Sequence, residues 1–277
     1  MIIKILKVTG FLSLLVLFIY FWDTAPLKPL KMFVVMLHEI SHGIGVLLTG
    51  GAVQGFALGI DESGLLKSSG GVFFIIAISG YLGSIIWGVL MLKTASSGRY
   101  NRFFSLFLAA VVILFTILPA DVTLDGVNGD LEQNWARYAI GFFWGGVLLI
   151  SALYAKRLNQ GILYALGFLT CMYAIFDLED FLGGRIMFTD AGILARYLAG
   201  GVNEYTLPLA YAIAGAISML TCFILTVYLQ DAIRTVSQTR ENLEEDVNEE
   251  VTEDEDSLEW IENMREKKLP RKKLWQW

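Results

Sequence analysis

Long apolar stretches separated by short polar segments make up most of this chain. Seven of them approach the length of about 20 residues that a helix needs to cross roughly 30 Å of hydrocarbon. They lie near residues 4–22, 31–49, 71–93, 103–119, 135–155, 160–179 and 206–229. Hydrophobic residues make up 55% of the sequence and charged residues only 17%, whereas soluble domains are about a quarter charged. We therefore expect an all-α, multi-pass integral membrane protein with about seven transmembrane helices in a lipid bilayer.

The segment that follows the second apolar stretch has a different pattern. Two short apolar runs flank residues 61–64, whose Asp-Glu-Ser-Gly sequence is typical of a tight turn. This arrangement predicts a small β-hairpin, which could add an extended peptide as a further strand. A packed connecting loop explains the same residues equally well.

The third apolar stretch carries a series of small residues. They are Ser79, Gly80, Gly83, Ser84 and Gly88. Small side chains let membrane helices approach each other closely, so we expect this helix to be tightly packed, with the helix of residues 31–49 as a candidate neighbour.

Charge separates residues 1–234 from residues 235–277. The first part carries 14 Lys or Arg and 14 Asp or Glu, whereas the tail carries 7 and 13, which accounts for the whole net charge of −6. Blocks of like charge repel each other and stay solvated, so we expect a membrane domain followed by a disordered tail. An acidic tail also argues against a nucleic acid as partner. Basic loops at residues 28–31, 93–102 and 156–157 lie on the side of the tail, which the positive-inside rule places in the cytosol.

The two histidines of the chain, His38 and His42, lie four residues apart in the second apolar stretch, directly before and three residues after Glu39. Residues four apart share one face of a helix, so both imidazoles can reach one metal ion. The pattern His-Glu-x-x-His on a helix is typical of zinc hydrolases, in which the glutamate takes a proton from water. Ionisable groups inside a membrane segment are costly, which favours a metal site over a chance spacing.

A catalytic zinc ion normally has three protein ligands, and no third histidine exists. Asp177 follows the apolar residues of the sixth stretch, and Asp180 shares its helix face. The second and sixth stretches should run in the same direction, which would bring Asp177 to the depth of His42. Asp125, in a polar segment between the fourth and fifth stretches, is the alternative.

These residues resemble the site-2 proteases, and more closely their M50B-like branch. The resemblance is carried by residues 38–42, 50–51, 69–71, 79–83, 173–180 and 189–191. It implies intramembrane proteolysis, with zinc held by His38 and His42, water activated by Glu39, and Asp177 as third ligand. Residues 124–126 match the Leu-Asp-Gly motif that supplies the aspartate in better-studied members, so Asp125 remains an alternative.

The sequence thus predicts a zinc-dependent intramembrane endopeptidase that cleaves a membrane-embedded or juxtamembrane segment of a membrane protein. The alternative is a membrane scaffold or transporter that binds metal without proteolysis. The presence of Glu39 favours the enzyme, because metal binding alone does not require it.

Overall fold

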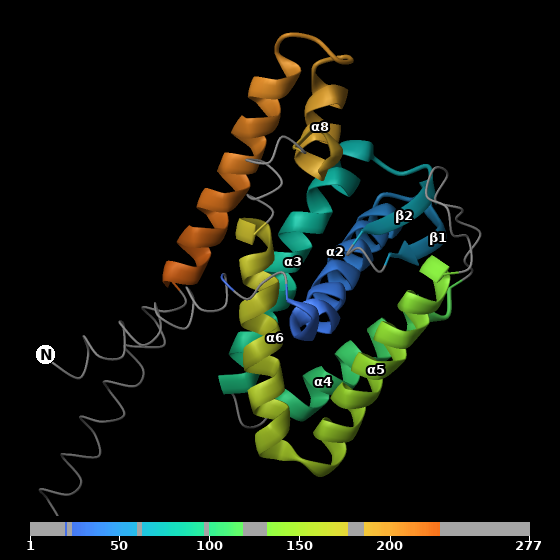
Figure 1. Cartoon of the computed structure of the whole chain (residues 1–277), viewed down its shortest axis with the longest axis vertical. Coiled ribbons are helices and arrows are strands. Elements are labelled where there is room, and N and C mark those ends of the chain that lie inside the picture. The colour runs from blue at the N-terminus through green and yellow to red at the C-terminus, as the bar shows by residue number, and fades with distance from the viewer. Residues whose placement is uncertain are drawn as a thin grey trace, which may run out of the picture. The chain divides into compact units, whose positions relative to one another are not determined.

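The computed structural model describes residues 20, 24–59, 63–96, 100–118, 132–176 and 186–227. The chain divides into two units, Met1–Phe223 and Ile224–Trp277, and nearly all described residues belong to the first (Figure 1). The described elements are η1 (Ala25–Leu27), α2 (Lys28–Leu48), β1 (Ala52–Leu58), β2 (Gly64–Ser69), α3 (Phe73–Ser96), α4 (Asn101–Thr116), α5 (Glu132–Tyr154), α6 (Lys156–Phe176), η2 (Ile186–Phe188), α8 (Asp190–Leu198) and a helix over Thr206–Val227.

Four helices in the described residues are long and apolar enough to cross a membrane: Lys28–Leu48, Phe73–Ala95, Trp135–Tyr154 and Thr206–Val227. The prediction of a helical membrane protein is confirmed, but a count of seven spans is not. Helix α4 has 16 residues, which is short for a span. Helix α6 begins with a polar turn of Lys, Arg, Asn and Gln, so its apolar part is also short. The predicted span at residues 4–22 lies almost entirely outside the described residues.

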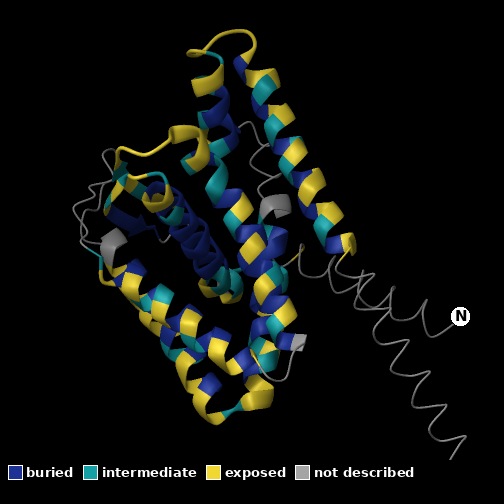
Figure 2. Ribbon diagram, turned by 180° about the vertical axis from the view of Figure 1, so that it is seen from behind, coloured by how far each residue is buried: buried dark blue, intermediate teal, exposed yellow. Residues whose placement is uncertain are grey.

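Helix α2 is surrounded by the rest of the first unit. Every residue from Lys31 to Gly43 is buried, and in Figure 2 this helix is almost uniformly dark blue, whereas α5 has an exposed stripe. A helix that is apolar on all sides must be enclosed by protein or lipid. Here protein encloses it, so the three ionisable groups of its histidine motif lie in the interior of the fold.

The hairpin after α2 is present. Strands β1 and β2 pair antiparallel, with Ala52 opposite Ser69 and Leu58 opposite Gly64, and with an irregularity between Val53 and Gly55. The end of β1 is buried in the main hydrophobic core, and alternate residues of β2 are exposed. This burial joins the hairpin firmly to the helices.

The small residues of α3 allow two close helix contacts, as the sequence predicted. A Cβ atom at Gly83 would overlap the side chain of Ser41 on α2, and one at Gly88 would overlap Cys171 Sγ on α6. Helix α3 therefore lies between α2 and α6, close to both. Because the small residues occupy successive turns, the contact extends along the helix.

A second, smaller hydrophobic cluster follows in the chain. It joins η2, α8 and the helix Thr206–Val227 through Ile186, Ala191, Ala195, Ala210 and Ala214. This cluster is separate from the main core that contains α2.

We expect Gly88→Val to lower stability by about 1–3 kcal/mol, because the added methyl groups must push α3 away from α6. Thermal unfolding followed by circular dichroism in detergent would measure the loss. Gly146→Val is the matched control, since a Cβ there meets no atom within 4 Å. Equal stability of the two variants would contradict the close contact.

Candidate metal centre

Three side-chain atoms converge at the middle of α2. The Nε2 atoms of His38 and His42 lie 3.1 Å apart, and Asp190 Oδ2 lies 2.7 Å from the first and 2.9 Å from the second. Both histidines are buried, and the Asp190 side chain is only 22% exposed. The histidines come from one face of α2, and the aspartate comes from the first residue of α8, 148 residues after His42.

The donor set fits a divalent metal ion. His42 Nδ1 lies 2.6 Å from the carbonyl oxygen of Ile76, which only accepts hydrogen bonds, so Nδ1 carries the proton and Nε2 offers a lone pair. His38 Nδ1 faces the Ser84 hydroxyl at 3.4 Å. Tetrahedral zinc with nitrogen and oxygen ligands at 2.0–2.2 Å needs ligand atoms roughly 3.3 Å apart. The observed separations of 2.7–3.1 Å are shorter than that value, so the three atoms would have to move apart by a few tenths of an ångström around an ion.

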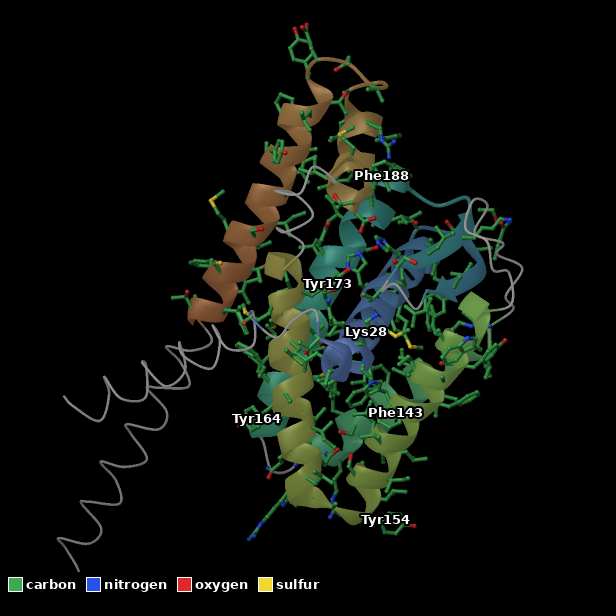
Figure 3. All side chains as sticks on the ribbon, viewed as in Figure 1. Lys28, Phe143, Tyr154, Tyr164, Tyr173 and Phe188 are labelled. Atoms are coloured by element: carbon green, nitrogen blue, oxygen red, sulfur yellow. The ribbon has the colours of Figure 1, made fainter. Side chains whose placement is uncertain are left out.

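Aromatic rings hold His38 in its orientation. The ring centroids of Tyr81 and Tyr173 lie 5.1 Å and 5.3 Å from that of His38, both nearly perpendicular to it. Tyr81 comes from α3 and Tyr173, labelled in Figure 3, comes from the last turns of α6. Edge-to-face contacts of this kind fix ring orientation, so three helices determine where the His38 nitrogen points.

Gly80 closes the site on the side of α3. A Cβ atom at this position would lie 2.5 Å from Nε2 of each histidine. No side chain is therefore tolerated here without displacing the ligand atoms. The small-residue pattern of α3 serves the site as well as the packing.

Glu39 lies under strand β2. A Cβ atom at Gly64 would lie 2.6–2.9 Å from the Glu39 carboxyl group and its neighbouring carbon, so the strand backbone covers this side chain closely. The backbone N–H of Leu66 donates a hydrogen bond to the Glu39 carboxylate. Glu39 is buried but has a defined partner, which offsets part of the cost of burying a carboxylate.

The start of α8 is built to present Asp190. Thr189 has an extended backbone and its hydroxyl accepts a hydrogen bond from Gly192 N–H, a standard N-cap. A Cβ at Gly192 would overlap the Ile186 carbonyl oxygen, so only glycine permits the tight approach of η2 to α8. Asp190 thus sits in the first turn of a helix, where the helix dipole favours a negative charge.

The structure places His38 and His42 together with Asp190, which the sequence analysis did not select as a ligand, and Glu39 directly after His38 on the same helix. Asp125, Asp177 and Asp180, the ligands that the sequence suggested, lie outside the described residues, so the structure does not test them. Tyr173, near the end of α6, lies beside His38.

The signal for Asp190 was present but local. The prediction of Asp177 rested on a carboxylate at the end of a long apolar stretch, whereas Asp190 begins a helix of only nine residues. The usable sign was the capping sequence Thr189-Asp190-Ala191-Gly192, which predicts a helix start with an acidic group at its N-terminus.

Gly80→Ala should lower zinc affinity about 10- to 100-fold, the usual cost of disturbing the surroundings of a metal ligand. Zinc bound per chain, measured by elemental analysis after dialysis against graded zinc buffers, tests this. Gly161→Ala on α6 is the control, because a Cβ there meets nothing within 4 Å. Unchanged zinc binding in Gly80→Ala would show that the histidine nitrogens do not hold the ion here.

Asp190→Ala should abolish stoichiometric zinc binding, because it removes one of three converging ligand atoms. Measured in the same way, Asp125→Ala, Asp177→Ala and Asp180→Ala should each retain one zinc per chain. Retention of zinc by Asp190→Ala together with its loss in Asp177→Ala would reverse the assignment.

A known family covers most of the chain. The family model described as Peptidase M50B-like matches residues 11–228, well over half of the sequence and the whole described core. No curated protein and no solved structure matches. The matched region contains the histidine pair, the hairpin and Asp190, in agreement with the resemblance seen in the motifs. The chain therefore belongs to the Peptidase M50B-like family.

Proposed function

We propose that this protein is a zinc-dependent intramembrane endopeptidase that cleaves a membrane-embedded or juxtamembrane segment of another membrane protein. His38, His42 and Asp190 hold the metal ion, and Glu39 is the general base. Membership of the Peptidase M50B-like family supports a membrane peptidase.

One observation carries the proposal: a buried carboxylate adjoins the converging ligand atoms. Glu39 follows His38 directly on α2, and its carboxylate does not supply any of the three converging ligand atoms. A protein that only binds or transports metal has no use for a second carboxylate, beside that of Asp190, held by a backbone N–H next to the ligands. A hydrolase does need one, because the attacking water must lose a proton.

In the proposed reaction Glu39 accepts a proton from the attacking water as it adds to the scissile carbonyl. It then delivers this proton to the amide nitrogen that leaves. Zinc in this ligand set acts as a Lewis acid, which acidifies water and polarises the carbonyl. His42 keeps its Nδ1 proton bound to the Ile76 carbonyl throughout, so its other nitrogen stays available to the metal.

The enclosure of the site suits a membrane substrate. Every residue from Lys31 to Gly43 is buried among other helices, two of which are candidate membrane spans in their own right. A low-dielectric surrounding strengthens the interactions of a charged group with the reacting atoms. A peptide bond in a membrane helix is otherwise shielded from water, so hydrolysis there needs a site of this kind.

Glu39→Gln should retain one zinc ion per chain and lower cleavage about 10²- to 10⁴-fold, the typical contribution of a general acid–base group. The assay is release of labelled fragments from a pool of single-span reporter proteins reconstituted in liposomes. Glu204→Gln, the same change at an exposed position, is the matched control.

Cleavage by Glu39→Gln at the wild-type rate would refute the role of Glu39 as base. If wild-type protein with one zinc per chain cleaves no reporter, the alternative of a non-proteolytic metal-binding membrane protein is favoured.

A further inference from the structure

Arg137 is the largest side chain that is fully buried in the described residues. It lies in Trp135–Tyr154 of α5, a candidate membrane span. The guanidinium group stays charged in proteins, and a charge inside a membrane segment is costly, so such residues usually have a function. Its hydrogen-bond partners in the described part of the chain are a backbone carbonyl and a tyrosine hydroxyl.

The bond to the backbone carbonyl fastens α5 to the hairpin, whereas the one to the tyrosine lies within α5. Arg137 Nη1 donates to the Phe56 carbonyl oxygen on β1 at 2.6 Å, and Nη2 donates to the Tyr138 hydroxyl at 2.7 Å. The guanidinium carbon lies 4.6 Å from the Tyr138 ring centroid and 5.9 Å from that of Phe56. The N-terminal end of α5 and strand β1 lie next to each other in Figure 1.

The pairing of the two strands extends this connection from β1 to β2. Phe56 is opposite Leu66. Gly59 N–H donates to the Ser63 carbonyl oxygen, which makes those two residues a hydrogen-bonded pair. Because such pairs alternate along an antiparallel ladder, Phe56 and Leu66 form a non-hydrogen-bonded pair, and their polar backbone groups point away from the partner strand.

The two outward-pointing backbone groups of this residue pair have partners at opposite edges of the two-stranded sheet. The Phe56 carbonyl accepts from Arg137, and the Leu66 N–H donates to Glu39. The distance between two paired strands is fixed by their hydrogen bonds. A force on Phe56 is therefore transmitted to the peptide group that contacts Glu39.

Helix α5 is itself anchored to α2. Trp144 Nε1 donates to the Pro29 carbonyl oxygen at 2.8 Å, and its ring packs against Phe33 with centroids 5.2 Å apart. Arg137 and Trp144 are seven residues apart, so they lie on the same face of α5. Phe33 and Glu39 are separated by a similar length of α2. Helix α5 thus has two attachment points, one at the start of α2 and one, through the hairpin, at Glu39.

We propose that Arg137 is a positioning residue for Glu39, acting through the Phe56–Leu66 pair of the hairpin. The inference rests on the proposed function, because it takes Glu39 to be the base of the reaction. Arg137 does not touch the reacting atoms. It holds strand β1 in position at Phe56. Through the pairing of the strands it also positions β2, whose backbone N–H at Leu66 binds the Glu39 carboxylate.

Arg137→Met, which keeps the length and removes the donors, should bind one zinc per chain and unfold cooperatively. Its kcat per zinc-loaded chain should fall about 10- to 100-fold, the cost of a small misplacement of a catalytic group, with KM within threefold of wild type. Arg137→Lys should recover part of kcat, because an ammonium group still donates to the Phe56 carbonyl. Tyr138→Phe keeps the ring and removes one acceptor, so it should show a weaker form of the same loss.

Two comparisons separate positioning from a general effect on the fold. Ser151→Ala removes another buried hydrogen bond of α5, the one to Asn159, and should leave kcat per zinc-loaded chain unchanged. In a Glu39→Asp background, whose carboxylate is one methylene shorter, Arg137→Met should lower kcat less than threefold. The inference would be overturned if Arg137→Met lowered kcat as much in the Glu39→Asp background as in the wild-type background. It would also be overturned if Arg137→Met alone had the wild-type kcat.

Hydrogen–deuterium exchange of the peptide spanning residues 64–69 gives a readout that does not depend on cleavage. Exchange should be faster in both Arg137→Met and Glu39→Ala than in wild type, with α6 unchanged. If wild-type protein cleaves no reporter, the proposed function fails, and faster exchange in both variants still supports the link. Wild-type exchange of residues 64–69 in Arg137→Met overturns the link whatever the activity.

Discussion

Two imidazole nitrogens and a carboxylate oxygen face one another at 2.7–3.1 Å in the interior of the first unit. Such groups repel unless a cation or a shared proton lies between them. The surroundings of the three atoms follow from this constraint. Helix α2 is enclosed on all sides, α3 has no side chain at Gly80, and the His42 ring is fixed by a backbone carbonyl. Each of these features keeps the three groups from moving apart, which would otherwise relieve their repulsion.

The sequence was sufficient where chemistry and periodicity coincide within one element. His38, Glu39 and His42 lie within five residues of a single helix, so helix geometry alone places them together. The tightly packed face of α3 was also predicted, and the hairpin was one of two alternatives of equal weight, because small residues and turn residues act locally. The number of spans was harder to predict. Apolar length does not distinguish a helix that crosses a membrane from one that is short or that begins with a polar turn, as α4 and α6 do.

Asp190 could not be deduced in this way, because its place depends on tertiary packing. It belongs to a short helix whose hydrophobic cluster is separate from the main core. Only the docking of this cluster against α3, seen in the contact of Phe73 with Tyr197 at 4.6 Å between ring centroids, brings the carboxylate to the histidines. A metal ion bound by all three groups would link the two clusters, so part of its binding free energy would go into holding them together.

A carboxylate that acts as a base inside a membrane domain faces two opposing demands. It must be shielded from water to be reactive, and it must be held by a hydrogen bond to stay in one place. A flexible polar side chain as its partner would itself have to be held in position. A backbone N–H avoids this difficulty, because a strand within a ladder has little freedom. Strand β2 comes close enough to supply it because residue 64 is glycine. The two residues of the hairpin that matter, Phe56 and Leu66, contribute through their backbone. A change in the register of the strands would therefore break this connection, because it would turn these backbone groups away from their partners.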